Sequence, residues 1–210
     1  MKVIATNISE TKEILYQGKI VKTGIYKYPV GEGIYLEAED VKGDSVVDRR
    51  YHGGVDKACY LYGVQSYPLW KEQYPNLDWS YGMFGENLTI LGLDERILKI
   101  GEQYSIGDAI IEISQPRQPC FKLGVRFESQ TIIKKFINST YSGIYVRVIK
   151  NGLVKSNDIM ERILDKPENP TIAEVFNCLY NQELKRSQIE KVLNCEELAE
   201  SAKKDIERRL

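Results

Sequence analysis

The stretch 109–120, AIIEISQPRQPC, is the most direct indication of fold class in this chain. Its first six residues, Ala109–Ser114, are mostly apolar and rich in isoleucine, as in a buried strand. The strand runs into a turn that contains Pro116 and Pro119 and ends at Cys120. Because two prolines limit the freedom of the backbone, the cysteine is expected to face one fixed direction.

Similar short runs rich in Val, Ile and Tyr recur along the first two-thirds of the chain, and glycine-bearing turns separate them. Besides 109–114, we expect strands at Lys2–Ile8, Ile14–Tyr16, Ile34–Glu37, Ala58–Tyr62, Asn87–Leu91 and Gly143–Ile149. Helices are expected at Gln65–Gln73 and Ile132–Ile137. The predicted fold class is therefore mainly β, a largely antiparallel β-barrel with helical excursions.

The composition changes at Lys166–Pro170 (KPENP), a polar linker with two prolines, so we expect a barrel domain over 1–165 and an appendage over 166–210. Three pairs beyond the linker resemble capping boxes and predict three short helices: Thr171 with Glu174, Ser187 with Glu190, and Asn194 with Glu197. An apolar stripe at helical spacing should dock this unit on the barrel or on a second subunit of a homodimer: Leu198, Ala202, Ile206 and Leu210.

Charge and hydropathy exclude several classes of partner. The 210 residues are 42% hydrophobic and 28% charged with a net charge of −1, so no global field favours nucleic acid or anionic lipid. No apolar stretch reaches the length of a membrane span, and the N-terminus lacks the apolar core of a signal peptide. We therefore expect a cytoplasmic protein that binds neither nucleic acid nor membrane.

The four cysteines include no CxxC pair, which argues against a zinc ribbon, an iron–sulfur cluster or a dithiol redox motif. Cys59, Cys178 and Cys195 lie in apolar or helical contexts and are expected to be buried and inert. Cys120 differs because Arg117 and Lys122 are close in sequence. Positive charge favours the thiolate, which is both a nucleophile and a ligand for soft metals.

Two other segments are dense in polar and turn-forming residues: 43–58 (GDSVVDRRYHGGVDKA) and 81–89 (YGMFGENLT). In the first, Gly53 and Gly54 would let backbone N–H groups approach a ligand, although a solvated charged hairpin explains the same residues. In the second, Glu86 and Asn87 either read the polar edge of a heterocycle or brace the neighbouring loop.

Taken in order, these motifs resemble the MOSC domain, named after the C-terminal region of molybdenum-cofactor sulfurases. They comprise Asp48 with His52–Ala58, Gly82–Leu88, Gly107-Asp108 and Pro116–Cys120. The segment Lys22–Val30 and the helical tail resemble the YiiM-like branch. The resemblance implies a β-barrel whose pocket holds a pterin-based molybdenum cofactor, with Cys120 as the protein ligand of the metal. It also implies reduction of N-hydroxylated compounds such as N-hydroxylated bases, a detoxifying activity; pyridoxal phosphate binding is a further assignment that such a resemblance can bring.

The resemblance also suggests roles for the polar residues. Lys22, Thr23 and Lys27 are expected at the phosphate of the cofactor, and Arg49 and His52 near the pterin or the substrate. The remaining candidates for cofactor binding are Arg50, Asp56, Lys57, Glu86, Asn87 and Arg117. We expect the fold to gather most of these basic residues around one cavity that contains Cys120.

His52 either donates a proton for the loss of water or only orders its loop through Asp48 or Asp56. Because the chain has no GxGxxG, iron–sulfur or haem signature, the electrons should come from an external electron-transfer protein. Two alternatives stay open. One is a non-catalytic carrier of the molybdenum cofactor or its sulfur, and the other is a hydrolase with Cys120 as nucleophile and His52 as base.

Overall fold

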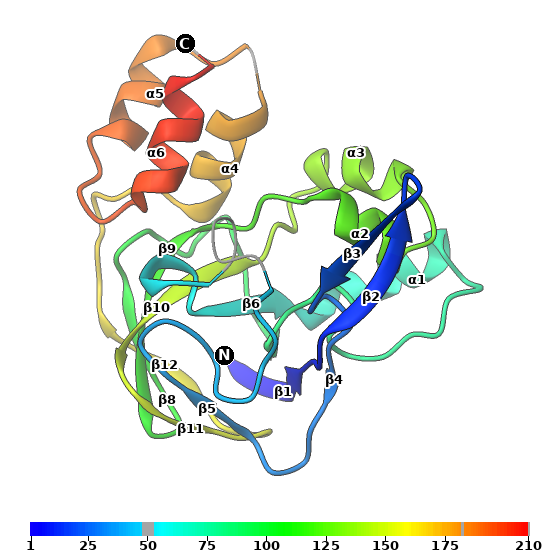
Figure 1. Ribbon diagram of the computed structural model, residues 1–210. Coiled ribbons are helices and arrows are strands. Elements are labelled where there is room, and N and C mark those ends of the chain that lie inside the picture. Colours follow the sequence, from blue (N-terminus) through cyan, green and yellow to red (C-terminus); the bar gives the residue numbers. More distant parts are fainter. Residues whose placement is uncertain (48–52, 182, 210) are drawn as a thin grey trace.

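The computed structural model describes residues 1–47, 53–181 and 183–209, and strands dominate the chain up to residue 164 (Figure 1). In these residues the strands are β1 (Lys2–Ile8), β2 (Lys12–Tyr16), β3 (Lys19–Thr23), β4 (Tyr28–Pro29), β5 (Ile34–Leu36), β6 (Cys59–Gly63), β7 (Leu88–Leu91), β8 (Gln103–Ile106), β9 (Ala109–Pro116), β10 (Ile144–Lys150), β11 (Gly152–Val154) and β12 (Met160–Leu164). Eight of them form one sheet in the order β12-β8-β9-β10-β6-β7-β1-β4, while β11 pairs with β5 and β2 with β3.

The α-helices are α1 (Tyr67–Gln73), α2 (Phe121–Arg126), α3 (Thr131–Ile137), α4 (Ile172–Tyr180), α5 (Arg186–Leu193) and α6 (Glu200–Glu207). Each strand and helix predicted in the first two-thirds of the chain is confirmed, with its ends moved by a few residues. The sequence did not indicate β3, β4, β8, β11, β12 and α2, because these elements are short or, like β12, largely exposed and lack a clear apolar alternation. No helix in the described ranges is long and apolar enough to cross a membrane.

Strand β6 separates two hydrophobic clusters, since every residue of Cys59–Gly63 is buried. Cys59 and Leu61 face a mainly aliphatic cluster, whereas Tyr60 and Tyr62 face an aromatic one. The alternation follows from the two-residue period of a strand, which sends neighbouring side chains to opposite faces. Tyr60 also pairs across the ladder with Tyr145 of β10, which brings two phenols to the same face.

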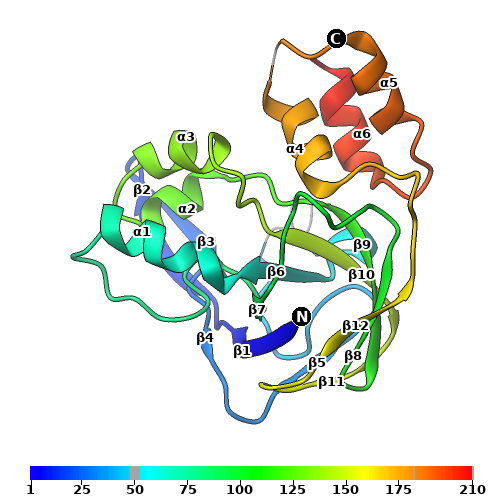
Figure 2. The same cartoon turned by 180° about the vertical axis from the view of Figure 1, so that it is seen from behind.

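Helices α1, α2 and α3 cover the aromatic cluster, and Figure 2 shows them grouped away from β8, β11 and β12. Within this cluster the Phe84 ring stacks on Tyr62 at 4.1 Å between centroids and contacts Phe127 at 5.2 Å. Trp70 donates from its indole nitrogen to the Tyr62 hydroxyl at 2.8 Å. Close aromatic packing of this kind gives the surrounding loops a rigid support.

Strand β1, second from one end of the strand order, approaches the start of β12, the strand at the other end. Lys2 forms an isolated β-bridge with Ile159, the residue before β12, and Val3 N donates to Asp158 O at 2.9 Å. The described residues show this bridge but no continuous ladder between β1 and β12. The fold is therefore mainly sheet, and its closure into a barrel stays a prediction.

The three C-terminal helices pack against the sheet of the same chain. Val175, Leu179 and Leu198 belong to the same aliphatic cluster as the strands, and Ala199 N donates to Ser114 O of β9 at 3.2 Å. The expected apolar stripe is confirmed for Leu198, Ala202 and Ile206, which are all buried. Leu210 lies outside the described residues, and the division of the chain at residue 165 stays a prediction.

Only the first of the three predicted helix starts is confirmed. Thr171 and Glu174 form a reciprocal capping box, with bonds of 3.1 and 2.7 Å. The second prediction was wrong because α5 begins at Arg186, before the expected cap at Ser187.

The third was wrong because α6 begins only at Glu200, and Glu197 instead contacts Lys166 and Asn169 at 2.5 and 3.0 Å. A capping pattern depends on residues three positions apart, whereas Glu197 binds Lys166 and Asn169, which lie about 30 residues earlier in the chain.

Candidate functional site

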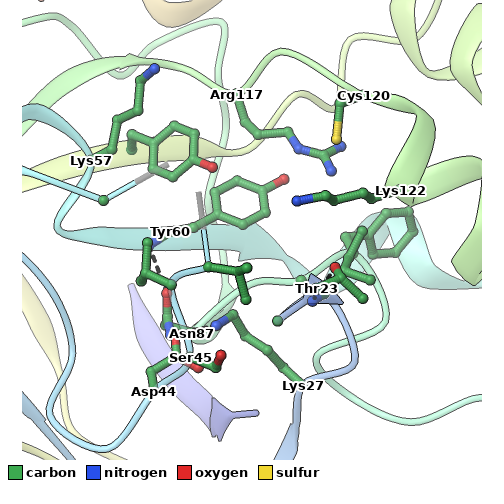
Figure 3. Close-up of a pocket in the computed structure, with 18 of the residues that line it drawn as sticks. Thr23, Lys27, Asp44, Ser45, Lys57, Tyr60, Asn87, Arg117, Cys120 and Lys122 are labelled. Atoms are coloured by element: carbon green, nitrogen blue, oxygen red, sulfur yellow. Dashed lines mark hydrogen bonds and ion pairs between the residues drawn. The ribbon is translucent and has the colours of Figure 1, made fainter. Parts of the chain in front are cut away.

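A pocket lies on the aromatic side of β6 (Figure 3). Segments far apart in sequence form its walls: residues 23–27, residues 44–47, residues 53–58 and the stretch from Arg117 to Lys122. Of the predicted site residues that the structure describes, six line the pocket: Thr23, Lys27, Lys57, Asn87, Arg117 and Cys120. The expected gathering of charged residues around Cys120 therefore holds for part of the set.

Arg117 follows Pro116, the last residue of β9, and is only 4% exposed. Its guanidinium lies over the rings of Phe136 and Tyr60, at 5.1 and 5.7 Å from their centroids. Its Nη1 atom is buried and has no hydrogen-bond partner in the described part of the chain. Because an unmatched buried donor is costly, a guanidinium held in this way in a pocket wall suits an anionic ligand.

Cys120 is half-buried, whereas the burial predicted for Cys59, Cys178 and Cys195 is confirmed. Figure 3 shows the Cys120 sulfur beside the Arg117 guanidinium, and the Lys122 side chain reaching toward the centre of the pocket. Burial lowers the pKa of Arg117, but Tyr60 and Cys120 outweigh this effect and the pKa is raised. One wall thus presents a thiol between two cationic side chains.

Lys27 lies on the opposite wall, and its charge is already matched. Its ammonium forms a buried ion pair with the carboxylate of Asp44. The same carboxylate accepts hydrogen bonds from Asn87 Nδ2 at 2.9 Å and from the backbone N of Ser9 at 2.9 Å. Asn87 also accepts from Tyr60 N at 3.2 Å, so this network ties the wall to β6.

Two phenols line the pocket between these walls. Tyr60 donates its hydroxyl to Ser142 O at 2.9 Å. Burial raises the pKa of Tyr145 to about 12, and Arg117 partly counteracts it. Burial also raises the pKa of Tyr60, so both phenols are protonated near neutral pH, and the single O–H of Tyr60 is already used in its bond to Ser142.

The other predicted site residues lie elsewhere. Lys22 is exposed on β3, opposite Glu13 of β2, and does not line the pocket. Asp56 forms an ion pair with Arg147 at 2.7 Å. Glu86 is fully buried and braces its own loop, accepting from Gly82 N at 2.9 Å, Phe84 N at 3.0 Å and Thr89 Oγ1 at 2.9 Å.

Arg49, Arg50 and His52 lie outside the described residues, so their predicted roles stay predictions. Lys57 lines the pocket, and burial lowers its pKa, while the carboxylates of Asp205 and Asp56 act in the opposite direction.

Sequence reasoning missed Asp44, Tyr60 and Tyr145 as pocket residues. Tyr60 and Tyr145 stand in apolar strands, where a tyrosine reads as core, and only the cross-strand register places them together. Asp44 lies in the dense segment 43–58 but had no visible partner in the sequence. Its partners Lys27 and Asn87 are 17 and 43 residues away.

In the described ranges, no group of three or more His, Cys, Asp or Glu side chains is placed to hold a metal ion. Among the described residues that line this pocket, the ligand suited to a soft metal is the sulfur of Cys120.

Two family profiles match this chain. The profile of the MOSC domain matches residues 48–161, and that described as "YiiM-like, 3-alpha helix domain" matches residues 170–210. The matched ranges include the Cys120 segment and the three C-terminal helices.

Relatives and solved structures give the same picture. "Uncharacterized protein YflK" of Bacillus subtilis (strain 168) is 34% identical over 200 residues, which cover 95% of this chain and 90% of YflK. A protein named "Reductase" from Gibberella moniliformis is 33% identical over 153 residues, covering 71% of this chain but 27% of the fungal one. The crystal structure of YiiM from Geobacillus stearothermophilus has a TM-score of 0.82 at 26% identity, covering 100% of this chain and 98% of that one.

Proposed function

The chain belongs to the MOSC domain family, and from this premise we propose that it is a molybdenum-cofactor-binding reductase of N-hydroxylated compounds, with Cys120 as the protein ligand of molybdenum. The observation that carries the proposal is the pairing, in one pocket, of a half-buried thiol with the buried guanidinium of Arg117, whose Nη1 has no hydrogen-bond partner among the described residues. A hydrolase would also use a thiol, and acylation of Cys120 distinguishes it from the reductase.

The described residues fit such a cofactor in chemical terms. A pterin dithiolene carries its own sulfur ligands for the metal, so a single protein thiolate suffices. Its phosphate requires cations or N–H donors in a partly desolvated cleft. Arg117 offers an unmatched donor there, and Lys122 adds a second positive charge on the same wall.

The assignment of the phosphate end therefore changes from the expectation based on sequence. Lys27 is held by Asp44 and contributes little net charge, and Lys22 does not line the pocket. We assign the anionic end to Arg117 and Lys122, with Thr23, Asn87 and Lys57 as further polar groups of the wall.

When bound, the cofactor would supply two-electron redox chemistry at molybdenum, with electrons delivered by an external electron-transfer protein. The overall reaction would convert R–NHOH, two electrons and two protons into R–NH2 and water. The chain's own residues would orient the substrate in the pocket, which the rings of Tyr60 and Tyr145 line, and the Tyr60 ring is held in place by the hydrogen bond from its hydroxyl to Ser142 O. His52 stays the proposed proton donor on the basis of the sequence.

A relative named as a reductase supports the reaction class. The name belongs to a fungal chain of which the match covers 27%, so it supports reduction in general and leaves the substrate to this proposal.

The test is metal and pterin analysis of protein made in a host that synthesises the cofactor. We expect about one molybdenum and one pterin per wild-type chain, and reduction of an N-hydroxylated base when reduced methyl viologen supplies electrons. Cys120→Ala should lose the metal and the activity while it keeps the wild-type unfolding temperature, because the change removes one sulfur from a half-buried turn.

Cys178→Ala is the matched control, since that thiol is buried in the three-helix unit and does not line the pocket. It should keep both metal and activity. Wild-type protein without molybdenum, or a fully active Cys120→Ala variant, would sink the proposal. Bound cofactor without turnover, but with transfer to an apo-enzyme, would select the carrier, and acylation of Cys120 by an ester would select the hydrolase.

A further inference from the structure

The segment that carries Arg117 and Cys120 has few backbone ties of its own. Beyond the end of β9, Arg117 N donates to Gly143 O at a long 3.4 Å, and Cys120 O accepts from Leu123 N at 3.0 Å. In the described part of the chain, the backbone groups of Gln118 and Pro119 between them form no hydrogen bond. Something other than the sheet must therefore hold this segment in place.

The three-helix unit supplies that support through side chains. Gln118 Nε2 donates to Asp205 Oδ2 of α6 at 2.9 Å. The Tyr180 hydroxyl of α4 donates to Gln118 Oε1 at 3.5 Å. Three residues before Gln118, in β9, Gln115 Oε1 accepts a hydrogen bond from Ser201 Oγ of α6 at 3.0 Å. Helices α4 and α6 thus form hydrogen bonds with side chains before and after Pro116.

We propose that the three-helix unit is part of the functional site, with Asp205 and Gln118 as positioning residues for Arg117 and Cys120. Gln118 is adjacent to Arg117 and two residues from Cys120, and Pro119 transmits its position because proline restricts the backbone. With the amide of Gln118 anchored, the guanidinium and the thiol keep their shared orientation in the pocket. This inference rests on the proposed function only for the role of Cys120 as the metal ligand.

Asp205 also acts on the neighbouring wall. Its carboxylate favours the charged form of Lys57, a pocket residue that burial would otherwise push toward the neutral form. In Figure 3 the Lys57 ammonium points away from Cys120 and Arg117. Asp205 of α6 therefore interacts with Gln118 and with Lys57, which are about 60 positions apart in sequence and belong to two walls of the pocket.

The experiment measures the segment directly in the full-length chain, purified from a host that does not make the cofactor. The readouts are the rate of Cys120 alkylation by iodoacetamide at fixed pH and the amide exchange of residues 117–121, both by mass spectrometry. Asp205→Ala should raise both rates about fivefold, the effect of one net hydrogen bond on a local equilibrium. Gln118→Met removes the same bond from the other side and should give the same increase.

Two variants separate positioning from general stability. Asp205→Asn keeps an oxygen that accepts from Gln118 and should restore wild-type rates. Arg208→Ala removes the ion pair of Asp205 Oδ1 with Arg208 at 3.0 Å, leaves Gln118 untouched and should change neither rate.

Wild-type rates in both Asp205→Ala and Gln118→Met, or an equal increase in Arg208→Ala, would overturn the inference. Should Asp205→Ala fail to fold, Gln118→Met decides. Because the protein carries no cofactor here, the result is independent of whether molybdenum binds.

Discussion

Two buried cations face the same pocket in opposite electrostatic states. Lys27 forms an ion pair with Asp44, whose carboxylate also accepts from Asn87 and Ser9. Arg117 has aromatic rings around it and a buried Nη1 without a partner among the described residues. The two residues are similarly buried, with Lys27 6% and Arg117 4% exposed. They differ in that Lys27 has a carboxylate partner in Asp44.

The comparison separates a cation that is ion-paired inside the fold from one with an unpaired donor atom, which the proposed function assigns to the cofactor. In the Lys27–Asp44 pair each charge is neutralised by the other inside the fold, and the ion pair holds residues 27 and 44 together. A buried guanidinium donor without a partner lowers stability until an anion binds to it, which is why the proposed function assigns Arg117 to the anionic end of the cofactor. Substitutions at the two positions should therefore have opposite signatures.

The largest effect is expected at the matched pair. Lys27→Met leaves the buried Asp44 carboxylate without its cation and should lower the free energy of unfolding by about 3–5 kcal/mol. Urea denaturation measures this loss. The double variant Lys27→Met with Asp44→Asn removes both charges and should regain most of it; a double variant as unstable as the single one would break the comparison.

Glu95 extends the comparison to a buried carboxylate that does not line the pocket. It accepts from Gly143 N at 2.8 Å, and burial raises its pKa from the usual 4.5 to about 7. Because the folded state holds the proton more tightly than the unfolded state, this contribution to stability is complete below about pH 4.5. It is lost as the pH rises through about 7.

Glu95→Gln should therefore be more stable than wild type at pH 8 by about 3 kcal/mol and similar to it at pH 4.5. Denaturation curves across this range measure the difference. A constant difference over the whole range would show that Glu95 does not titrate there.

Arg117→Met should weaken cofactor binding without lowering stability, whereas Lys27→Met should lower stability. Cofactor affinity should fall about 30-fold, the scale of a lost charge-assisted hydrogen bond, while the free energy of unfolding stays equal or rises. Molybdenum and pterin content after dialysis, together with urea denaturation, test both halves. Destabilisation as large as that of Lys27→Met would mean that Arg117 is a structural cation too.

The smallest effect is expected at Lys122, which lies in the pocket but is only half-buried. Solvent screens its charge, so Lys122→Ala should weaken cofactor retention about fivefold. Lys22→Ala is the matched control, since Lys22 is exposed on β3, and retention there should not change. Equal losses in the two variants would show that the effect is one of overall charge.

Much of the fold was predictable because its signals are local. The runs around Val146 and Ile113 read as strands from their own composition, and the cap at Thr171 is formed by residues three positions apart. The proline turn before Cys120 likewise marked that cysteine out from three others that proved to be buried.

The sequence by itself determined which side chains could act, whereas the tertiary structure decided which of them are free to do so. Lys27 and Arg117 are both basic, but only folding brings Asp44 to the first and leaves the Nη1 of the second without a hydrogen-bond partner among the described residues. The contact between Gln118 and Asp205 spans 87 residues and that between Arg147 and Asp56 spans 91. Local pattern carries no record of such partners, because ion pairing depends on distance in space and not on position along the chain.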